Sequence, residues 1–213
     1  MANIRKFSGL TPIRHITGAP WNGQLEIFYH STADASAIYK GSIVEGTQGL
    51  AATGYSDPLG VYQSIMVCAD DSITGIVGVA WSFGETPQLA TRVSNLNAVN
   101  YCPASTAMYV GVITDPTVVF EVSDNGGTAI TAAQIGSYIS STGNADGNAT
   151  TGRSCGAIDQ GKIQATHAML VPLRILRLVN RPDNEIGTYA HWEVMLNTHV
   201  DKVHSSLNSY RAT

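Results

Sequence analysis

Charged side chains are scarce in this chain of 213 residues: Asp, Glu, Lys and Arg make up 13%, about half the usual share in globular proteins. The formal net charge is −4, and Arg5 and Lys6 form the only basic cluster. Because a nucleic-acid surface needs grouped cations, we expect no direct nucleic-acid partner. Free soluble proteins generally use charge to keep apart, so this composition is typical either of a protein that works bound to another or of one whose Ser, Thr and Asn side chains solvate the surface instead.

Long apolar runs and paired cysteines are missing as well. No apolar run approaches the roughly 20 residues that span a bilayer, so we expect no membrane partner. The N-terminus lacks the apolar core of a signal peptide, which predicts a protein made and kept in a cytoplasm. Cys68, Cys102 and Cys155 are widely spaced and form no CxxC pair, so zinc and thioredoxin-like chemistry have no support. Cys68 is expected to be buried, and Cys155 to be the most exposed thiol.

Familiar catalytic and metal-binding patterns are absent or out of context. None of the six histidines falls in an HxH or HExxH pattern. Residues 144–148 lack the distal glutamate of a calcium loop. Residues 152–156 have the letters of a serine nucleophile elbow around Ser154, but no clear strand precedes them. We therefore predict no enzyme, with no catalytic residue, metal or cofactor. A hydrolase that uses Ser154 or paired aspartates is the remaining enzymatic alternative.

Strand-forming segments separated by turn clusters make up most of the chain. β-branched and aromatic residues predict strands over 25–29, 37–44, 61–67, 75–83, 108–113 and 118–122. Residues 172–200 predict a further hairpin, because Pro182 with Asp183 and Asn184 interrupts an apolar run that an aromatic strand follows. The pattern predicts a mainly β fold, a single β-barrel or sandwich built largely from residues 25–122 and 168–197.

One or two short helices complete the predicted fold. Thr131 and Gln134 have the spacing of a capping box, and Ile135 with Ile139 supplies an apolar face, which predicts a helix over 131–139. A second helix is predicted over 198–210 from apolar residues at helical spacing.

The N-terminal residues 1–23 predict an extended arm, and residues 24–213 a single β-rich domain. Pro12, Gly18 and Pro20 argue against a regular element in the arm, although it is too apolar for a free tail. The residues expected to contact a partner are Ile4, Arg5, Phe7, Leu10 and Ile13. In one arrangement the arm docks on a partner, with Arg5, Lys6 and Arg14 pairing with acidic groups. In the other it folds back over the chain's own barrel.

A series of short motifs runs through the second half of the chain. An Asp–Pro turn enters the strand TDPTVVFEV at 114–122, and Gly136, TGRS at 151–154 and Ile158–Asp159 follow. The segment PLRILRLVNRPDNEIG at 172–187 and the residues NTH at 197–199 complete the series. Over about residues 108 to 200, these motifs resemble tailed-bacteriophage capsid decoration proteins, also called cement or head proteins, which are encoded near the major capsid protein.

The resemblance implies a structural virion protein that binds the outside of a bacteriophage capsid and stabilises the capsomer lattice. Its partners would be the major capsid protein and further copies of itself, with a trimer favoured over a dimer because decoration proteins commonly sit at local three-fold axes. The implied location is the virion capsid surface, after synthesis in the host bacterial cytoplasm. The resemblance supplies no catalytic residues. A head-fibre or tail component that recognises a host surface is the alternative.

Overall fold

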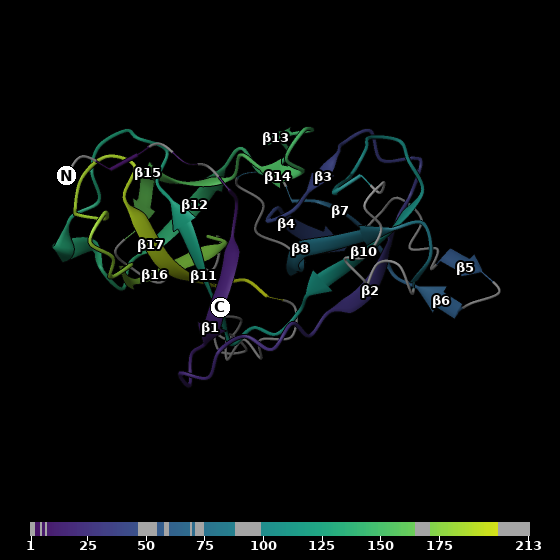
Figure 1. Ribbon diagram of the computed structural model, residues 1–213, viewed down its shortest axis with the longest axis horizontal. Helices are drawn as coiled ribbons and strands as arrows, with labels where there is room; N and C mark the ends of the chain where they lie inside the picture. Colours follow the sequence, from purple (N-terminus) through teal and green to yellow (C-terminus); the bar gives the residue numbers. More distant parts are fainter. Residues whose placement is uncertain are drawn as a thin grey trace, which may run out of the picture.

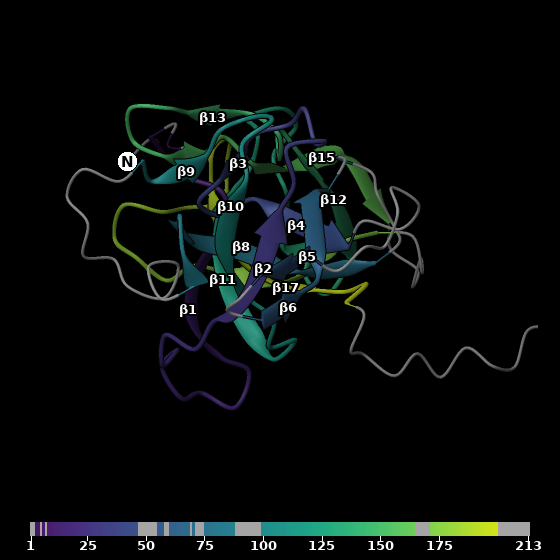
Figure 2. The same cartoon turned by 90° about the vertical axis from the view of Figure 1, so that its right-hand side faces the viewer.

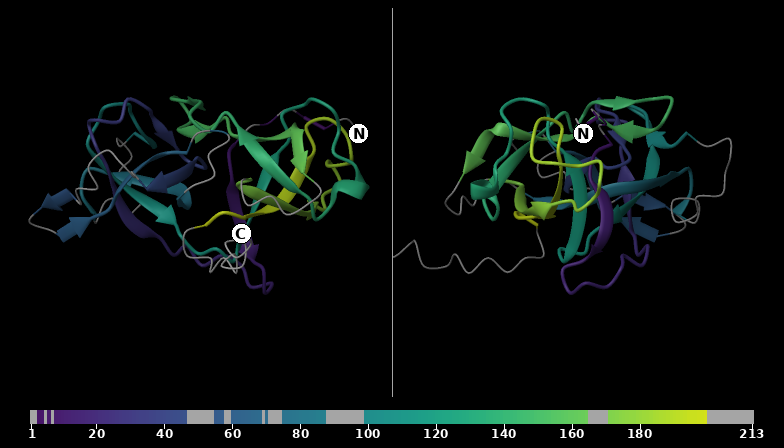
Figure 3. Two further views of the ribbon diagram at one scale, coloured as in Figure 1. Left: turned by 180° about the vertical axis from the view of Figure 1, so that it is seen from behind. Right: turned by 60° about the vertical axis from the view of Figure 1, so that its left-hand side comes forward.

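The computed structural model describes residues 3–4, 6, 8–46, 55–57, 60–68, 70, 75–87, 99–164 and 171–199. Strands hold 49% of the residues and helix only 3%, and the strands are arranged as two β lobes that lie side by side (Figure 1). Seen from behind, the same two lobes remain separate (Figure 3). This architecture confirms the prediction of a mainly β fold with a barrel. Among the described residues, no helix is long and apolar enough to span a membrane.

The first lobe is a closed barrel of five strands, which Figure 2 turns toward the viewer. In order around the barrel the strands are β10 (Met108–Ile113), β2 (Glu26–His30), β7 (Ser64–Val67), β4 (Ile43–Gly46) and β8 (Ile76–Gly84). Neighbours are antiparallel except for β2 and β7, which are parallel. β10 is buried along its whole length. One face lies in the barrel cluster, Tyr109 packs on Tyr29 of β2, and Ile113 joins the cluster shared with the second lobe.

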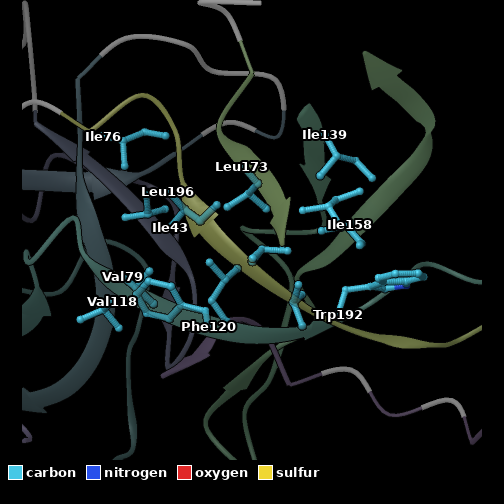
Figure 4. Close-up of a cluster of buried hydrophobic side chains, with 14 of the residues drawn as sticks. Ile43, Ile76, Val79, Val118, Phe120, Ile139, Ile158, Leu173, Trp192 and Leu196 are labelled. Carbon is cyan, nitrogen blue, oxygen red and sulfur yellow. The ribbon is translucent and has the colours of Figure 1, made fainter. Parts of the chain in front are cut away.

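The second lobe is a six-stranded antiparallel sheet, here called the curled sheet. Its order is β1 (Thr11–His15), β11 (Val118–Ser123), β17 (His191–Leu196), β16 (Leu173–Leu178), β12 (Tyr138–Thr142) and β15 (Ala157–Gln164). The sheet bends until β15 comes back to the end of β11, where Asp124 and Ile158 form a single parallel bridge. Asn125 N also donates to the Ile158 carbonyl at 3.1 Å. The inner face carries Phe120, Ile139 and Trp192 (Figure 4).

The barrel lobe is an insertion between two neighbouring strands of the curled sheet. β1 pairs with β11, yet all the barrel strands lie between them in the chain. The chain leaves after His15 and returns before Val118, and Ile16 N donates to the Thr117 carbonyl at 2.8 Å where the two connections meet. One apolar cluster joins the lobes, with Ile43 and Val79 of the barrel against Phe120 of the sheet (Figure 4).

Three small two-stranded sheets decorate this framework. β3 (Ile38–Tyr39) pairs with β9 (Tyr101–Cys102). β5 (Tyr55–Asp57) pairs with β6 (Gly60–Tyr62), and this hairpin projects from the far end of the barrel lobe (Figure 1). β13 (Gly147–Asn148) pairs with β14 (Arg153–Ser154) near the junction of the lobes. Backbone hydrogen bonds from Lys40 N to the Gly152 carbonyl, at 2.9 Å, and from Ser154 N to the Lys40 carbonyl, at 3.0 Å, tie this hairpin to the barrel lobe.

The predicted helix over 131–139 is wrong beyond its first turn. The capping box forms, with Thr131 N donating to Gln134 Oε1 at 2.7 Å, but only the 3-10 helix Ala132–Gln134 follows. Gly136 then takes a φ of +88°, and residues from Tyr138 join the curled sheet as β12. Backbone pairing with β15 and β16 outweighs the weak helical pattern. At the C-terminus, Thr198 and His199 are not helical, and residues 200–210 lie outside the described residues.

The predicted arm also differs, because its second half belongs to the curled sheet. Leu10 is completely buried, and Thr11–His15 forms the edge strand β1. Pro12 is compatible with this position because an edge strand needs fewer backbone donors, and the register shifts between Pro12 and Arg14. Residues 10–15 therefore take the second of the two arrangements, folding back on the chain itself.

Candidate functional site

A cleft of about 560 Å³ lies between the N-terminal residues and the curled sheet, and we call it the N-terminal cleft. Its walls come from described residues between 3 and 11, from β11 and β14, and from the turn after β16 with the start of β17. The charged side chains that line it are Lys6, Glu121, Arg153, Arg181, Asp183 and His191. Polar groups from four separate chain segments thus converge on one hollow, which is the usual character of a binding site.

The N-terminal segment is held in place at both ends, and we call its described residues 3–4, 6 and 8–10 the N-terminal strap. At one end Asn3 Nδ2 donates to the carbonyls of Glu185, at 2.9 Å, and Thr188, at 3.1 Å. Glu185 N donates back to Asn3 Oδ1 at 3.0 Å. At the other end Leu10 N donates to the Gly41 carbonyl at 2.9 Å, and the Leu10 side chain enters the core. The strap therefore forms a fixed wall of the cleft.

Gly9 lets the strap pass between the barrel lobe and the β13–β14 hairpin. Its φ is +61°, and a Cβ at this position would lie 2.6 Å from the Gly41 carbonyl oxygen and 2.8 Å from Ser154 Cβ. A residue with a side chain would both strain the backbone and clash. The close approach at Gly9 positions the strap over the cleft.

Two glutamates on the outer face of the curled sheet lie directly opposite each other in the strand register, Glu121 on β11 and Glu193 on β17. Like charges in this position repel. Glu193 accepts from Arg14 Nη2 at 2.5 Å and is paired with Arg177 Nη2 at 2.9 Å. Burial raises the pKa of the Glu193 carboxyl, but the two arginines outweigh burial and lower it overall.

Glu121 is engaged inside the cleft by two other side chains, Arg181 and His191. Arg181 Nη1 donates to Glu121 Oε1 at 2.5 Å, and His191 Nδ1 lies 2.9 Å from the same oxygen in a geometry short of a full hydrogen bond. The nearby His191 ring is the largest cause of a lowered pKa for the Glu121 carboxyl, and Arg181 adds to it against burial. Arg181 Nε also lies 3.3 Å from Asp183 Oδ1.

The chemistry of this glutamate pair is that of two ionised carboxylates. A glycosidase needs one carboxylic acid that keeps its proton to protonate the leaving group. Both Glu121 and Glu193 have lowered pKa values, so neither is suited to hold that proton. The pair is better explained as a cross-strand ion network than as an acid and a base.

Two cations of the cleft are left without an anionic partner. Lys6 and Arg153 are both exposed, and neither forms an ion pair with any residue in the described part of the chain. The other charged groups of the cleft are engaged with one another. An incoming anion would therefore meet Lys6 and Arg153 first.

The five predicted contact residues are separated by the structure. Ile4 is 78% exposed and lines the cleft, whereas Leu10 is fully buried in the core and Ile13 is partly buried in β1. Arg5 and Phe7 lie outside the described residues. The expected pairing of Arg14 with a partner is also changed, since Arg14 binds Glu193 of its own chain.

Ile4 and Lys6 were named from the sequence, but the cleft residues of β11, β14 and the β16–β17 region were missed, although one signal points to them. Glu121 interrupts the apolar strand of β11, and His191 and Glu193 alternate with Trp192 and Val194 in β17. Polar residues at every second position of such strands mark an outer face. The sequence does not reveal that the N-terminal strap covers this face.

A second group of reactive side chains lies inside the barrel lobe. His30 Nε2 lies 3.1 Å from Asp34 Oδ2, and His30 Nδ1 lies 3.1 Å from Cys102 Sγ and 2.8 Å from the Thr106 carbonyl. Burial opposes the charged ring, but Asp34 and Cys102 outweigh it and raise the pKa of His30 to about 10. The residue types are those of a cysteine nucleophile with its base and acid. However, His30 and Cys102 have no exposed surface, so this group serves to hold β2 and β9 together.

The alternative nucleophile Ser154 is also inaccessible to a substrate. It is 1% exposed in the β13–β14 hairpin, and its Oγ accepts a hydrogen bond from Gly156 N at 2.9 Å. Cys68 is buried and Cys155 partly exposed, as predicted. Among the described residues, no group of three or more His, Cys, Asp or Glu side chains is arranged to hold a metal ion.

Comparison of the chain with protein-family models, with curated proteins and with solved structures found no match. The resemblance to decoration proteins therefore rests on the sequence motifs. The structure shows where these motifs lie. TVVFEV at 117–122 makes up most of β11, TGRS at 151–154 includes β14, and the segment 172–199 contains β16 and β17. All of these elements border the N-terminal cleft or the sheet behind it.

Proposed function

We propose that this chain is a structural virion protein that binds the outside of a bacteriophage capsid and stabilises the capsomer lattice. The observation that carries the proposal is the exposure of Ile4, which is 78% accessible on a strap anchored at both ends. Ile186, in the turn that binds Asn3, is also 49% exposed. Both apolar side chains are therefore accessible for contact with a partner protein.

The two-lobed shape and the place of the motifs also support this function. The motifs that resemble decoration proteins lie mainly in the curled sheet, and the barrel lobe, which resembles the family less, is inserted between β1 and β11. An elongated body with two lobes can touch two neighbouring subunits of a shell (Figure 1). In this arrangement the curled sheet provides the common framework, and the barrel lobe adapts to a particular capsid.

Stabilisation of the lattice would follow from mass action. A protein that binds the assembled shell and not its separated subunits stabilises assembly in proportion to its occupancy. When many copies bind at symmetric sites, a modest affinity at each contact gives strong binding overall, and self-association into trimers would strengthen this effect. The major capsid protein and further copies of the chain are therefore the proposed partners.

The test is binding to purified heads that lack this protein. The chain should sediment together with the heads. Electron microscopy should show added density at symmetric positions on the outer surface, and these heads should withstand heating better than heads without the chain. Labelling confined to tail tips would favour the host-recognition alternative instead. Absence of the chain from both heads and tails would overturn the proposal.

A further inference from the structure

We propose that the N-terminal cleft binds an extended acidic segment of a partner protein, in which carboxylates pair with Lys6 and Arg153 and an apolar side chain packs on Ile4. The inference rests on the proposed function for the partner's identity, which would be a capsid subunit. The recognition chemistry comes from the cleft alone and can be tested without a capsid.

The charged residues of the cleft favour an anionic ligand. Glu121 is already paired with Arg181 and lies beside His191, and Asp183 lies 3.3 Å from Arg181. Lys6 and Arg153 remain unpaired among the described residues, although the chain as a whole carries a net charge of −4. Two cations that line one cleft both attract the same carboxylate, and because both are exposed, salt weakens that attraction.

The same balance favours an acidic peptide over a nucleic acid. A phosphate chain carries one charge per nucleotide and needs a continuous track of cations. Here two free cations stand beside Glu121 and Asp183, which would repel neighbouring phosphates. The exposed Ile4 adds an apolar contact that suits a peptide with alternating apolar and acidic side chains.

The cleft has a fixed form before any partner arrives. Lys6 lies between the anchors at Asn3 and Leu10, and Arg153 lies in β14, whose backbone is bonded to Lys40. Preorganised groups lose little entropy on binding. A volume of about 560 Å³ fits a short segment rather than a whole protein surface. The affinity of one cleft for such a segment is therefore modest, and a capsid lattice would be held by many copies of this contact.

The experiment measures binding of a labelled eight-residue probe peptide, alternating Val or Leu with Asp or Glu and blocked at both ends, to the isolated full chain. A matched peptide with Asn and Gln in place of the acids is the first control. We expect the acidic peptide to bind about tenfold more tightly at low salt, with the difference shrinking as salt rises. The double variant Lys6→Gln with Arg153→Gln should lose that difference.

The matched control variant is Arg174→Gln. Arg174 is an exposed cation of the same sheet that stacks on Tyr138 and does not line the cleft, so its loss should leave peptide binding unchanged. Equal binding of the two peptides, full binding by the double variant, or stronger competition by an oligonucleotide than by the acidic peptide would each overturn the inference.

The outcomes separate this inference from the proposed function. If heads bind the double variant as well as the natural chain, the cleft inference fails and capsid binding stands. If the acidic peptide binds the cleft but heads do not bind the chain, the cleft is a peptide site and the proposed function fails.

Discussion

Glu121 and Glu193 face each other across the pair β11–β17, and each carboxylate is paired with two basic side chains. Glu193 is bound by Arg14 of β1 and Arg177 of β16, so its carboxylate ties the edge strand to the far side of β17. The network thus connects four adjacent strands on the outer face of the curled sheet. It also explains why Arg14 is unavailable to a partner while Lys6 and Arg153 are free of ion pairs within the described residues.

The first prediction concerns the buried member of this network. Glu193→Gln removes the charge between Arg14 and Arg177, so we expect a loss of about 2 kcal/mol in the free energy of unfolding. Urea denaturation measures it. Glu26→Gln, at an exposed position at the start of β2, is the control and should change stability by less than about 0.5 kcal/mol. Equal effects of the two substitutions would show that the network contributes nothing.

The second prediction is a dependence on alkaline pH. The pKa of His30 is raised from 6.5 to about 10, so the folded state binds its proton more tightly than the unfolded state. That stabilisation is complete below about pH 6.5 and is lost as the pH rises toward 10. NMR titration of the His30 ring should give a midpoint far above that of an exposed histidine. Asp34→Asn should lower the midpoint, and an unchanged midpoint would rule out Asp34 as its partner.

A third prediction separates backbone strain from steric clash. Gly9 and Gly18 both have positive φ, but a Cβ at Gly18 would meet nothing within 4 Å, whereas one at Gly9 would collide with Gly41 and Ser154. Gly18→Ala should therefore cost about 1 kcal/mol from strain alone. Gly9→Ala should cost roughly 2 kcal/mol more, because the added Cβ collides with the Gly41 backbone and with Ser154 in the folded state. Similar thermal shifts for the two variants would contradict the close packing at Gly9.

The fourth prediction tests the role of the strap by truncation. Removing residues 1–18 deletes the buried Leu10 and strand β1, so we expect a loss of several kcal/mol in stability. Removing only residues 1–8 keeps both and should lower the unfolding temperature little. Calorimetry of the two truncated chains makes the comparison. Equal stability of both would mean that β1 is not part of the folded core.

The fifth prediction addresses the exposed apolar contact. Ile4→Asp should leave folding unchanged, because the side chain is 78% exposed, and should weaken binding to heads about tenfold or more. Ile135→Asp alters a side chain that is 45% exposed and outside the cleft, and serves as the matched control. The amount of each variant that sediments with the heads measures this binding. Equal retention of both variants would place the capsid contact elsewhere.

Local sequence was enough to locate the strands with strong side-chain preferences. β10 has the predicted bounds, and β8 and β11 differ from prediction by about one residue at an end, because each is a run of β-branched and aromatic residues. β12 and β15 were missed, since Ser140, Ser141, Gln160 and Gly161 carry no strand signal. These segments become strands because their backbones pair with each other and with β16.

For the site, the chain itself indicated a contact at Ile4 but not the cleft around it. The other cleft residues come from β11, β14 and the β16–β17 turn, which are distant in sequence from the strap. Composition and the period-two pattern determined a mainly β, weakly charged protein, because side-chain preference and burial act locally. Only the tertiary structure decided that the barrel is inserted between β1 and β11, and that Leu10 is buried while Ile4 is exposed. Strand pairing over long separations depends on backbone hydrogen bonds and shared burial, which no short stretch of sequence encodes.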